Sequence, residues 1–158
     1  MIGTEEFRNV MGHFATGVTV VTSRGADGVP LGLTVNAFTS VSLDPLLVLV
    51  CIHRRASGHD ALLESGHFAV NVLRREQEDL ALRFSATDAS ERFRDLPATD
   101  GPLGTPLIPG ALAWLECRVR EVFPGGDHSV ILGEVVGCQA HPGEPLLFFK
   151  GRLMGLGG

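Results

Sequence analysis

The chain has 158 residues and a net charge of −5, with 44% hydrophobic and 20% charged residues. This length is typical of one domain that can bury a core, and the composition is that of a soluble globular protein, so we expect a single domain over residues 1–158. The negative charge argues against nucleic acid as a partner, because nucleic-acid-binding domains usually carry a basic face.

No segment of the sequence is suited to a membrane or to secretion. The longest uninterrupted apolar run, Pro45–Ile52, is far shorter than the roughly 18 residues of a membrane-spanning helix. The first residues lack the basic and apolar regions of a signal peptide. The three cysteines, Cys51, Cys117 and Cys138, form no Cys-x-x-Cys pair and no disulfide framework, so we expect reduced thiols in the cytoplasm.

The first predicted element is a helix over Thr4–Met11, which Thr4 can cap and whose first turn is acidic. The elements predicted after it are strands over Val18–Thr22, from Val29, over Val41–Leu43 and over Leu46–Ile52, a helix over Ser57–Ser65, a strand over Phe68–Leu73 and a helix over Glu76–Phe84. Because every residue of Leu46–Ile52 is apolar, we expect this strand to be buried on both faces.

Regular structure is interrupted between Thr87 and Gly110, a stretch that holds Pro97, Pro102, Pro106 and Pro109. A loop of this length is usually functional or disordered. The last predicted elements are two long strands over Leu112–Phe123 and Ser129–Ala140, the hairpin turn Pro124–Asp127 that joins them, and a strand over Pro145–Lys150. Strands and helices do not alternate as in a doubly wound sheet, which indicates a closed or half-open antiparallel barrel with helices at its ends.

The stretch Thr34–Ala37, followed by the hydroxyls of Thr39, Ser40 and Ser42, is dense in small and polar residues. Its backbone groups and the Asn36 amide could pair with the polar edge of a flat ring such as an isoalloxazine. Ordinary strand residues with hydroxyls facing water would show the same pattern, and the pattern by itself favours that interpretation.

The segment Cys51–Gly58 runs from a strand into a predicted helix start and carries Arg54 and Arg55. Unpaired amide groups at a helix start and two guanidinium groups would suit a phosphate. A solvated helix cap with two surface arginines fits the residues equally well.

The predicted hairpin tip holds Asp127 beside His128. Asp127 could orient the His128 ring toward a substrate, although the glycines and Asp127 also suit a plain turn. The other histidines show no metal-ligand spacing, so we expect no metal site. The sequence contains no P-loop, no Rossmann Gly-x-Gly-x-x-Gly and no Gly-x-Ser-x-Gly motif, so a nicotinamide would bind without a Rossmann domain.

Taken together, the motifs resemble the short-chain flavin reductase family, the reductase partners of two-component flavin-dependent monooxygenases. The matching segments are, in chain order, Phe7–Arg8, Gly12–Thr22, Gly32–Ala37, Ser42–Pro45, Ser65–Leu73, Leu115–Cys117, Gly126–His128, Leu132–Val135 and Pro145–Gly151. Each segment is short, but together they follow the family's order and cover nearly the whole chain.

The resemblance implies a mainly β fold, an antiparallel split β-barrel of Greek-key type with short peripheral helices, that forms a homodimer. It implies binding of FMN or FAD, its reduction by NADH or NADPH, and release of reduced flavin, which diffuses to a partner monooxygenase. It implies neither a membrane nor a nucleic acid as partner. A flavin-bound electron carrier or ferric reductase on the same fold is an alternative, and a non-enzymatic barrel for another flat ligand is a third.

The family's functional residues carry over to positions of this sequence. The flavin would contact Leu33, Thr34, Val35, Asn36, Ala37, Cys51, Ile52, His53, Arg54, Arg55, Ala56, Ser57, Gly58 and Phe84. The nicotinamide nucleotide would contact His128, which takes the catalytic role, and Phe149, Lys150 and Gly151. Many members carry two hydroxyl residues at the flavin phosphate, where this chain has Ala56-Ser57-Gly58. Many also carry a tyrosine after the final strand, where this chain has Leu153-Met154.

Overall fold

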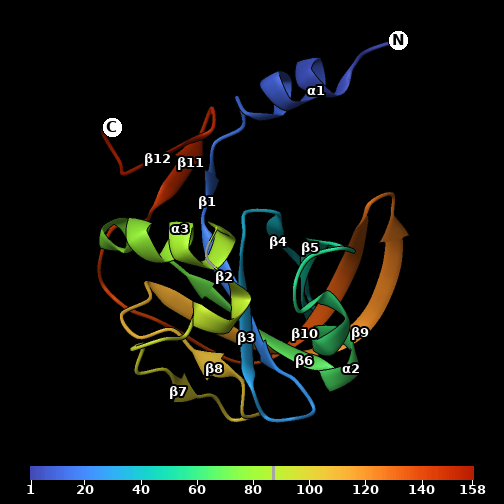
Figure 1. The fold of residues 1–158 in the computed structure, drawn as a ribbon, viewed down its shortest axis with the longest axis vertical. Helices are drawn as coiled ribbons and strands as arrows, with labels where there is room; N and C mark the ends of the chain where they lie inside the picture. Colours follow the sequence, from blue (N-terminus) through green and yellow to red (C-terminus); the bar gives the residue numbers. More distant parts are fainter. Residues whose placement is uncertain (87) are drawn as a thin grey trace.

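The structure is a computed structural model that describes residues 1–86 and 88–158 (Figure 1). It is mainly β, and its largest element is a seven-stranded antiparallel sheet with the strand order β3-β2-β6-β9-β10-β5-β4. These strands are β2 (Thr19–Arg24), β3 (Pro30–Val35), β4 (Phe38–Leu43), β5 (Leu46–His53), β6 (His67–Val72), β9 (Ala113–Gly125) and β10 (His128–Ala140).

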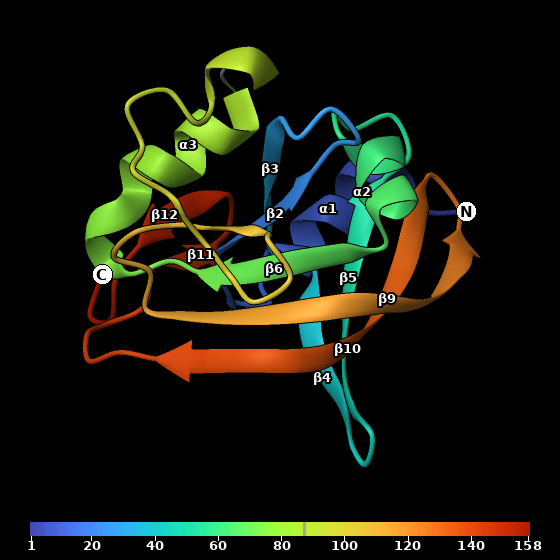
Figure 2. The same ribbon diagram turned by 90° about the horizontal axis from the view of Figure 1, so that it is seen from below.

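Two small sheets and three short α-helices lie around the large sheet. The small sheets consist of β1 (Thr16–Gly17), β11 (Leu147–Phe149) and β12 (Arg152–Met154), and of β7 (Thr99–Asp100) with β8 (Pro106–Leu107). The helices are α1 (Thr4–Met11), α2 (His59–Ser65) and α3 (Glu78–Ala86), with 3-10 turns at Arg75–Gln77 and Ala89–Glu91. Figure 2 shows the long β9 and β10 strands crossing the molecule beneath α3 and α2. Within the described ranges, none of these helices has the length and apolarity needed to cross a membrane.

The large sheet curls but does not close. Its edge strands are β3 and β4, which follow each other in sequence and are joined only by Asn36 and Ala37. The two edges therefore approach each other at this connection, where the Cys51 amide donates to the Ala37 carbonyl at 3.0 Å. The antiparallel sheet confirms the mainly β prediction, but in the described part of the chain no ladder joins the two edges into a closed barrel.

The core consists of two clusters on opposite faces of the sheet. Val21, Val50 and Phe68 belong to the cluster inside the curl. Val20 and Phe84 belong to the second cluster, which lies beneath α3. Neighbouring residues of a strand point to opposite faces, so the β-branched run of β2 supplies both clusters and is buried along nearly its whole length.

Strand β5 differs from the sequence prediction, because only one of its faces is fully buried. Val48, Val50 and Ile52 point into the core, whereas Leu47, Leu49, Cys51 and His53 on the alternate face are only partly buried. The reason is that one face of a curled antiparallel sheet meets the core, while the described part of the chain covers the other face only partly. That second face contributes to a cavity described below.

The proline-rich stretch is ordered by a buried carboxylate. Glu116 on β9 is fully buried and accepts hydrogen bonds from the Leu103 amide and from the amide and hydroxyl of Thr105. This stretch therefore packs against the sheet, as far as it is described; Thr87, the first residue of the predicted irregular region, lies outside the described residues.

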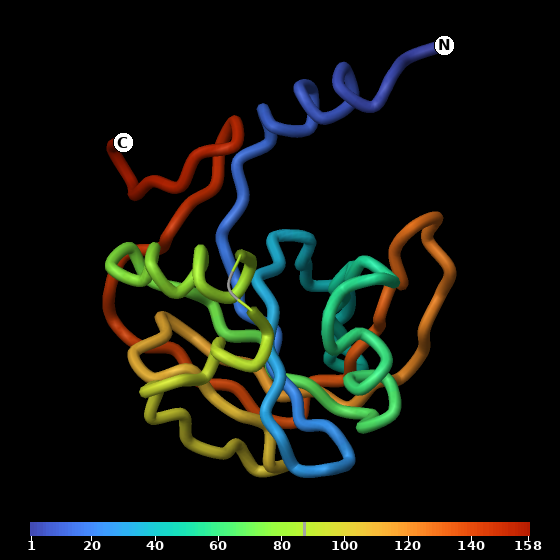
Figure 3. The backbone as a smooth tube through the Cα atoms, viewed as in Figure 1, coloured from blue at the N-terminus to red at the C-terminus, as the bar shows by residue number. Residues whose placement is uncertain are grey.

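Both ends of the chain project beyond the large sheet. Figure 3 shows α1 and the hairpin of β11 and β12 standing clear of it. Gly3, not Thr4, occupies the position before the first turn of α1, and none of the residues in this helix is buried. Strand β12 was not predicted, because its three residues lie between glycines and carry no alternating pattern that distinguishes them from a tail.

Candidate functional site

A cavity of about 330 Å³ opens where the two edges of the sheet approach each other. It is lined by Leu33, Thr34, Val35, Asn36, Ala37, Cys51, Ile52, His53, Ala56, Ser57, Phe84, Ser85, Arg92 and His128. The curl of the sheet brings β3 close to β5 here, although the two strands lie near opposite ends of the strand order. The structure thus assembles most of the residues that the sequence predicted for a flavin.

Helix α3 forms one wall of this cavity because it packs very closely on β3. Phe84 is fully buried and meets Phe93 edge to face, with the ring centroids 5.1 Å apart. The Thr34 hydroxyl donates to the Ala81 carbonyl at 2.7 Å, so it holds the helix and the strand together. The hydroxyl of Thr34, a residue predicted for the flavin, therefore stabilises the wall of the cavity.

Arg92 supplies a positive charge that sequence reasoning missed. Its Nη1 donates to the Gly32 carbonyl at 2.9 Å, and the side chain lines the cavity. Burial lowers the pKa of Arg92 and the nearby Asp88 raises it, but a guanidinium stays protonated in proteins. No periodic pattern marks Arg92, because it follows α3 in the irregular stretch.

Arg54 and Arg55 do not line the cavity, although both were predicted to hold the phosphate. Both side chains are exposed, and the turn that carries them continues into α2, which begins at His59. Gly58 has a φ of 89°, a left-handed conformation that favours glycine, and it closes the turn outside this cavity. His53, Ala56 and Ser57 of this turn line the cavity, and Ser57 is the one of them that carries a hydroxyl.

The turn between β9 and β10 places two imidazoles around one carboxylate. The Nδ1 atom of His128 lies 2.7 Å from Oδ1 of Asp127, and Nε2 of His53 lies 3.8 Å from Oδ2. The hydrogen bond with His128 is the main cause that lowers the pKa of Asp127. Because an ionised carboxylate only accepts, Nδ1 of His128 is the donor, which leaves its Nε2 atom for a ligand.

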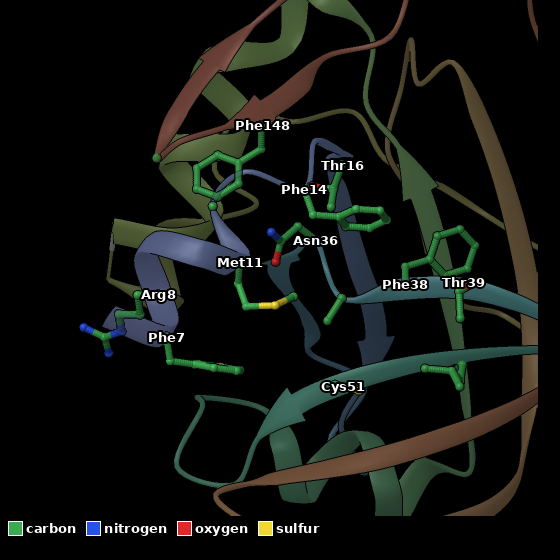
Figure 4. Close-up of a pocket in the computed structure, with 14 residues that line it drawn as sticks. Phe7, Arg8, Met11, Phe14, Thr16, Asn36, Phe38, Thr39, Cys51 and Phe148 are labelled. Carbon is green, nitrogen blue, oxygen red and sulfur yellow. The ribbon is translucent and has the colours of Figure 1, made fainter. Parts of the chain in front are cut away.

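A second cavity of about 670 Å³ adjoins the first and shares Asn36, Ala37 and Cys51 with it. Figure 4 shows Phe7 and Met11 of α1 reaching toward the strands, with the Asn36 amide near the centre of the view. The outer face of β5 contributes Leu49 and Cys51. Burial raises the pKa of the Cys51 thiol, so this group at the junction of the two cavities is a neutral thiol at neutral pH.

The residues predicted for the nicotinamide nucleotide are not brought together within one chain. His128 lines the first cavity and Gly151 lines the second, whereas Phe149 and Lys150 line neither of the two. The Lys150 ammonium lies 5.4 Å from the centroid of the Phe149 ring, and the Lys150 amide donates to Gly12. Figures 1 and 2 both place the tip of β9 and β10 far from the hairpin of β11 and β12.

Comparison with known proteins gives one consistent result. The sequence pattern of the flavin reductase like domain matches residues 11–157. The chain is 44% identical over 147 residues to the reductase component of 4-nitrophenol 4-monooxygenase/4-nitrocatechol 2-monooxygenase from Rhodococcus opacus, which covers 93% of this chain and 78% of that protein. It is 45% identical over 148 residues to the NADH-dependent FMN reductase SmoA of Agrobacterium fabrum, covering 94% of this chain and 83% of that protein.

A solved structure agrees with these sequence matches. The NADH:FAD oxidoreductase SgcE6 of Streptomyces globisporus, in complex with NAD and FAD fragments, superposes with a TM-score of 0.88 at 41% identity. The match covers 97% of this chain and 94% of that one. The similarity therefore extends over the large sheet, α1 and the terminal hairpin together.

Proposed function

Because this chain belongs to the flavin reductase like domain family and is a nicotinamide-dependent flavin reductase, we propose that its 330 Å³ cavity holds the flavin and that the 670 Å³ cavity receives the nicotinamide nucleotide. The observation that carries this assignment is the shared wall. Asn36, Ala37 and Cys51 border both cavities, so ligands in the two cavities meet at these residues. Hydride transfer requires such contact between two cofactors.

The residues of the smaller cavity fit a flavin. Its size is in the range of small-molecule sites, roughly 300–1,000 Å³. Leu33 and the fully buried Phe84 make the lining of the cavity apolar, and backbone groups of residues 34–37 can meet the polar edge of a flat ring. Ser57 and Arg92 in the cavity lining offer a hydroxyl and a cation for the phosphate, whereas the predicted Arg54 and Arg55 lie outside this lining.

Bound flavin supplies the hydride acceptor, and the protein's part is to hold the two ligands in contact. The backbone connection at Asn36 and Ala37 presents the shared wall. Asp127 fixes the orientation of His128, whose Nε2 atom can then hydrogen-bond a ligand at the rim. No proton needs to pass through these residues for a hydride to move, so positioning is the main catalytic contribution.

We further propose that the flavin, FMN or FAD, is held weakly and leaves after reduction to supply a partner monooxygenase by diffusion. Ala56 and Gly58 bring no side-chain hydrogen bond to the phosphate turn, which leaves Ser57 as its only hydroxyl. A weakly held cofactor is suited to delivery, whereas an electron carrier or ferric reductase must retain it. The three unpaired thiols support action in a reducing cytoplasm.

The test is a steady-state assay of NADH and NADPH oxidation with FMN, FAD and riboflavin, combined with gel filtration of the reduced mixture. We expect saturable turnover with each accepted flavin and a protein peak that is nearly free of flavin. A yellow protein that keeps one flavin per chain through gel filtration and turns over no added flavin would contradict delivery and favour the carrier.

We also propose that the chain folds as one domain, a split barrel whose gap lies between β3 and β5, and that two copies form a homodimer. Support comes from Phe7 and Phe14, which are 55% and 71% exposed, and from the outer face of β5. Replacing Phe7 and Phe14 together with glutamate should yield a monomer in sedimentation velocity. Val29→Glu is the matched control, because Val29 is 57% exposed and belongs to the connection between β2 and β3, which lies at the opposite end of the molecule from α1 in Figure 1. A monomeric wild-type protein at micromolar concentration would contradict the dimer.

A further inference from the structure

In the turn from His53 to Gly58, the backbone amides of Arg54, Arg55 and Ala56 each donate a hydrogen bond. The Arg54 amide donates to the Asp127 carbonyl at 2.9 Å, and the Ala56 amide donates to the His53 carbonyl at 2.9 Å. Between them, the Arg55 amide donates to Nδ1 of the His53 ring at 3.0 Å. A side chain that accepts from the amide two residues later stabilises a turn in the same way as an Asx motif.

These hydrogen bonds determine which groups of the turn remain for a ligand. In the described part of the chain, the structure pairs neither the Ser57 amide nor the Ser57 hydroxyl, and Ser57 lines the smaller cavity. Two unpaired donors of one residue at a cavity wall suit an anion. The direction of these two Ser57 donors depends on the conformation of the residues just before Ser57, which the hydrogen bond to the His53 ring stabilises.

His53 also connects this turn to the hairpin tip of β9 and β10. Its Nε2 atom faces Asp127, and its ring packs edge to face on His128 with the centroids 5.1 Å apart. Asp127 contacts the turn twice, since its carbonyl accepts from Arg54 and its carboxylate faces His53. A change in the His53 ring therefore affects both the turn from His53 to Gly58 and the support of His128.

We propose that His53 is a positioning residue for the flavin phosphate: its unprotonated Nδ1 accepts the Arg55 amide and thereby aims the Ser57 donors at the phosphate. This inference rests on the proposed flavin site and adds the role of one residue within it. It predicts that the acceptor atom, and not the charge of the imidazole, is what phosphate binding needs.

Protonation of His53 should therefore weaken phosphate recognition. A protonated Nδ1 carries a hydrogen and cannot accept from the Arg55 amide, so the turn loses this hydrogen bond as pH falls. The charged groups that face or flank the ring are Asp127 and His128 from the hairpin tip, Arg54 and Arg55 in the turn itself, and Arg92 across the cavity. Attraction between a protonated His53 and the phosphate would act in the opposite direction, and experiment can separate the two effects.

The experiment measures FMN and riboflavin dissociation constants by flavin fluorescence for wild type, His53→Leu and His53→Asn. Riboflavin lacks the phosphate, and asparagine keeps an acceptor for the Arg55 amide. We expect His53→Leu to weaken FMN about fivefold, the effect of one lost hydrogen bond, with riboflavin within twofold of wild type. His53→Asn should restore most of the FMN affinity. In the flavin-free protein, the Arg55 amide should exchange with solvent faster in the leucine variant than in the asparagine variant.

A pH series provides the second readout. The FMN preference over riboflavin in wild type, divided by that of His53→Asn, should fall as the pH is lowered. The division removes the second ionisation of the phosphate, which occurs at about pH 6, because both proteins share it. A ratio that rises as pH falls would mean that the imidazolium contacts the phosphate itself, and a flat ratio would mean that His53 protonation has no effect; either result overturns the proposal.

Other outcomes are equally decisive. If His53→Leu weakened the binding of FMN and of riboflavin equally, His53 would have only a structural role. Equal loss in the leucine and asparagine variants would overturn the role of the acceptor atom. Failure of the wild-type protein to bind either flavin would instead overturn the proposed flavin site, and the amide exchange of Arg55 would still show whether His53 braces the turn.

Discussion

A Cβ atom placed on Gly32 would lie 2.7 Å from the ring of Phe84. The same atom would lie 3.2 Å from the ring of Phe93, so two aromatic side chains occupy the space above this glycine. The absence of a side chain at position 32 lets α3 pack on β3 and bury Phe84 completely. That close approach also brings the end of α3 and Arg92 to the cavity.

Gly32→Ala should therefore displace α3 and disturb the cavity. Overpacking of this kind costs about 1–3 kcal/mol, and we expect a lower Tm together with weaker flavin binding. Gly17→Ala is the matched control, because a Cβ at Gly17 meets nothing within 4 Å and its strand lies in another sheet. Unchanged thermal unfolding and flavin affinity in Gly32→Ala would show that the rings move aside without cost.

Arg92→Ala should weaken FMN more than riboflavin. A charge-assisted hydrogen bond contributes about 1.5–3 kcal/mol, and the phosphate is the group that distinguishes the two ligands. The effect should exceed that of Arg54→Ala or Arg55→Ala, because Arg92 lines the cavity and these two do not. Arg94→Ala serves as the control, since Arg94 is exposed and faces Glu91. The assignment fails if all four variants bind FMN with the same affinity in fluorescence titrations.

His128→Asn should slow the transfer step more than it weakens flavin binding. The family resemblance assigns this ring to the nicotinamide nucleotide, whereas the structure places it in the lining of the smaller cavity, which is proposed for the flavin. Contact between Nε2 of the ring, which Asp127 orients, and the nucleotide would make the loss of His128 raise the KM for that nucleotide or lower kcat. The pKa of Asp127 is lowered, so its carboxylate is fully ionised above the ordinary pKa of an aspartate. The carboxylate, and with it the support of His128, is lost only as the pH falls through the lowered pKa. Single-turnover reduction at the wild-type rate, combined with reduced flavin affinity, would place His128 on the flavin side.

The three thiols should react with Ellman's reagent in a fixed order. Cys138 is exposed and should react first. Burial raises the pKa of Cys51, and burial, Glu116 and Cys138 raise that of Cys117 to about 12, so Cys51 should react slowly and Cys117 only after unfolding. In a Cys138→Ser variant, FMN should slow the Cys51 reaction further, because Cys51 borders the proposed flavin cavity. Labelling of Cys51 at an unchanged rate with saturating FMN would argue against that location.

Local sequence patterns determined the strands and the turns between them. The β-branched residues of β2 and the glycines between β9 and β10 act within a few residues, so strand and hairpin were both predictable. The order of the motifs along the chain was sufficient to indicate the family. Asn36, Ala37 and Cys51 were already candidates for the flavin, because their neighbours match that family.

Only the tertiary structure decided which of these segments meet. The approach of β3 to β5 depends on a seven-strand order that no local pattern encodes, and it creates the wall that the two cavities share. Arg92 reaches the site because α3 packs on Gly32, while Arg54 and Arg55 turn outward although they are close to Ser57 in sequence. The alternating burial of β5 has the same origin, since whether an apolar face is covered depends on what packs against it and not on the apolar residues themselves.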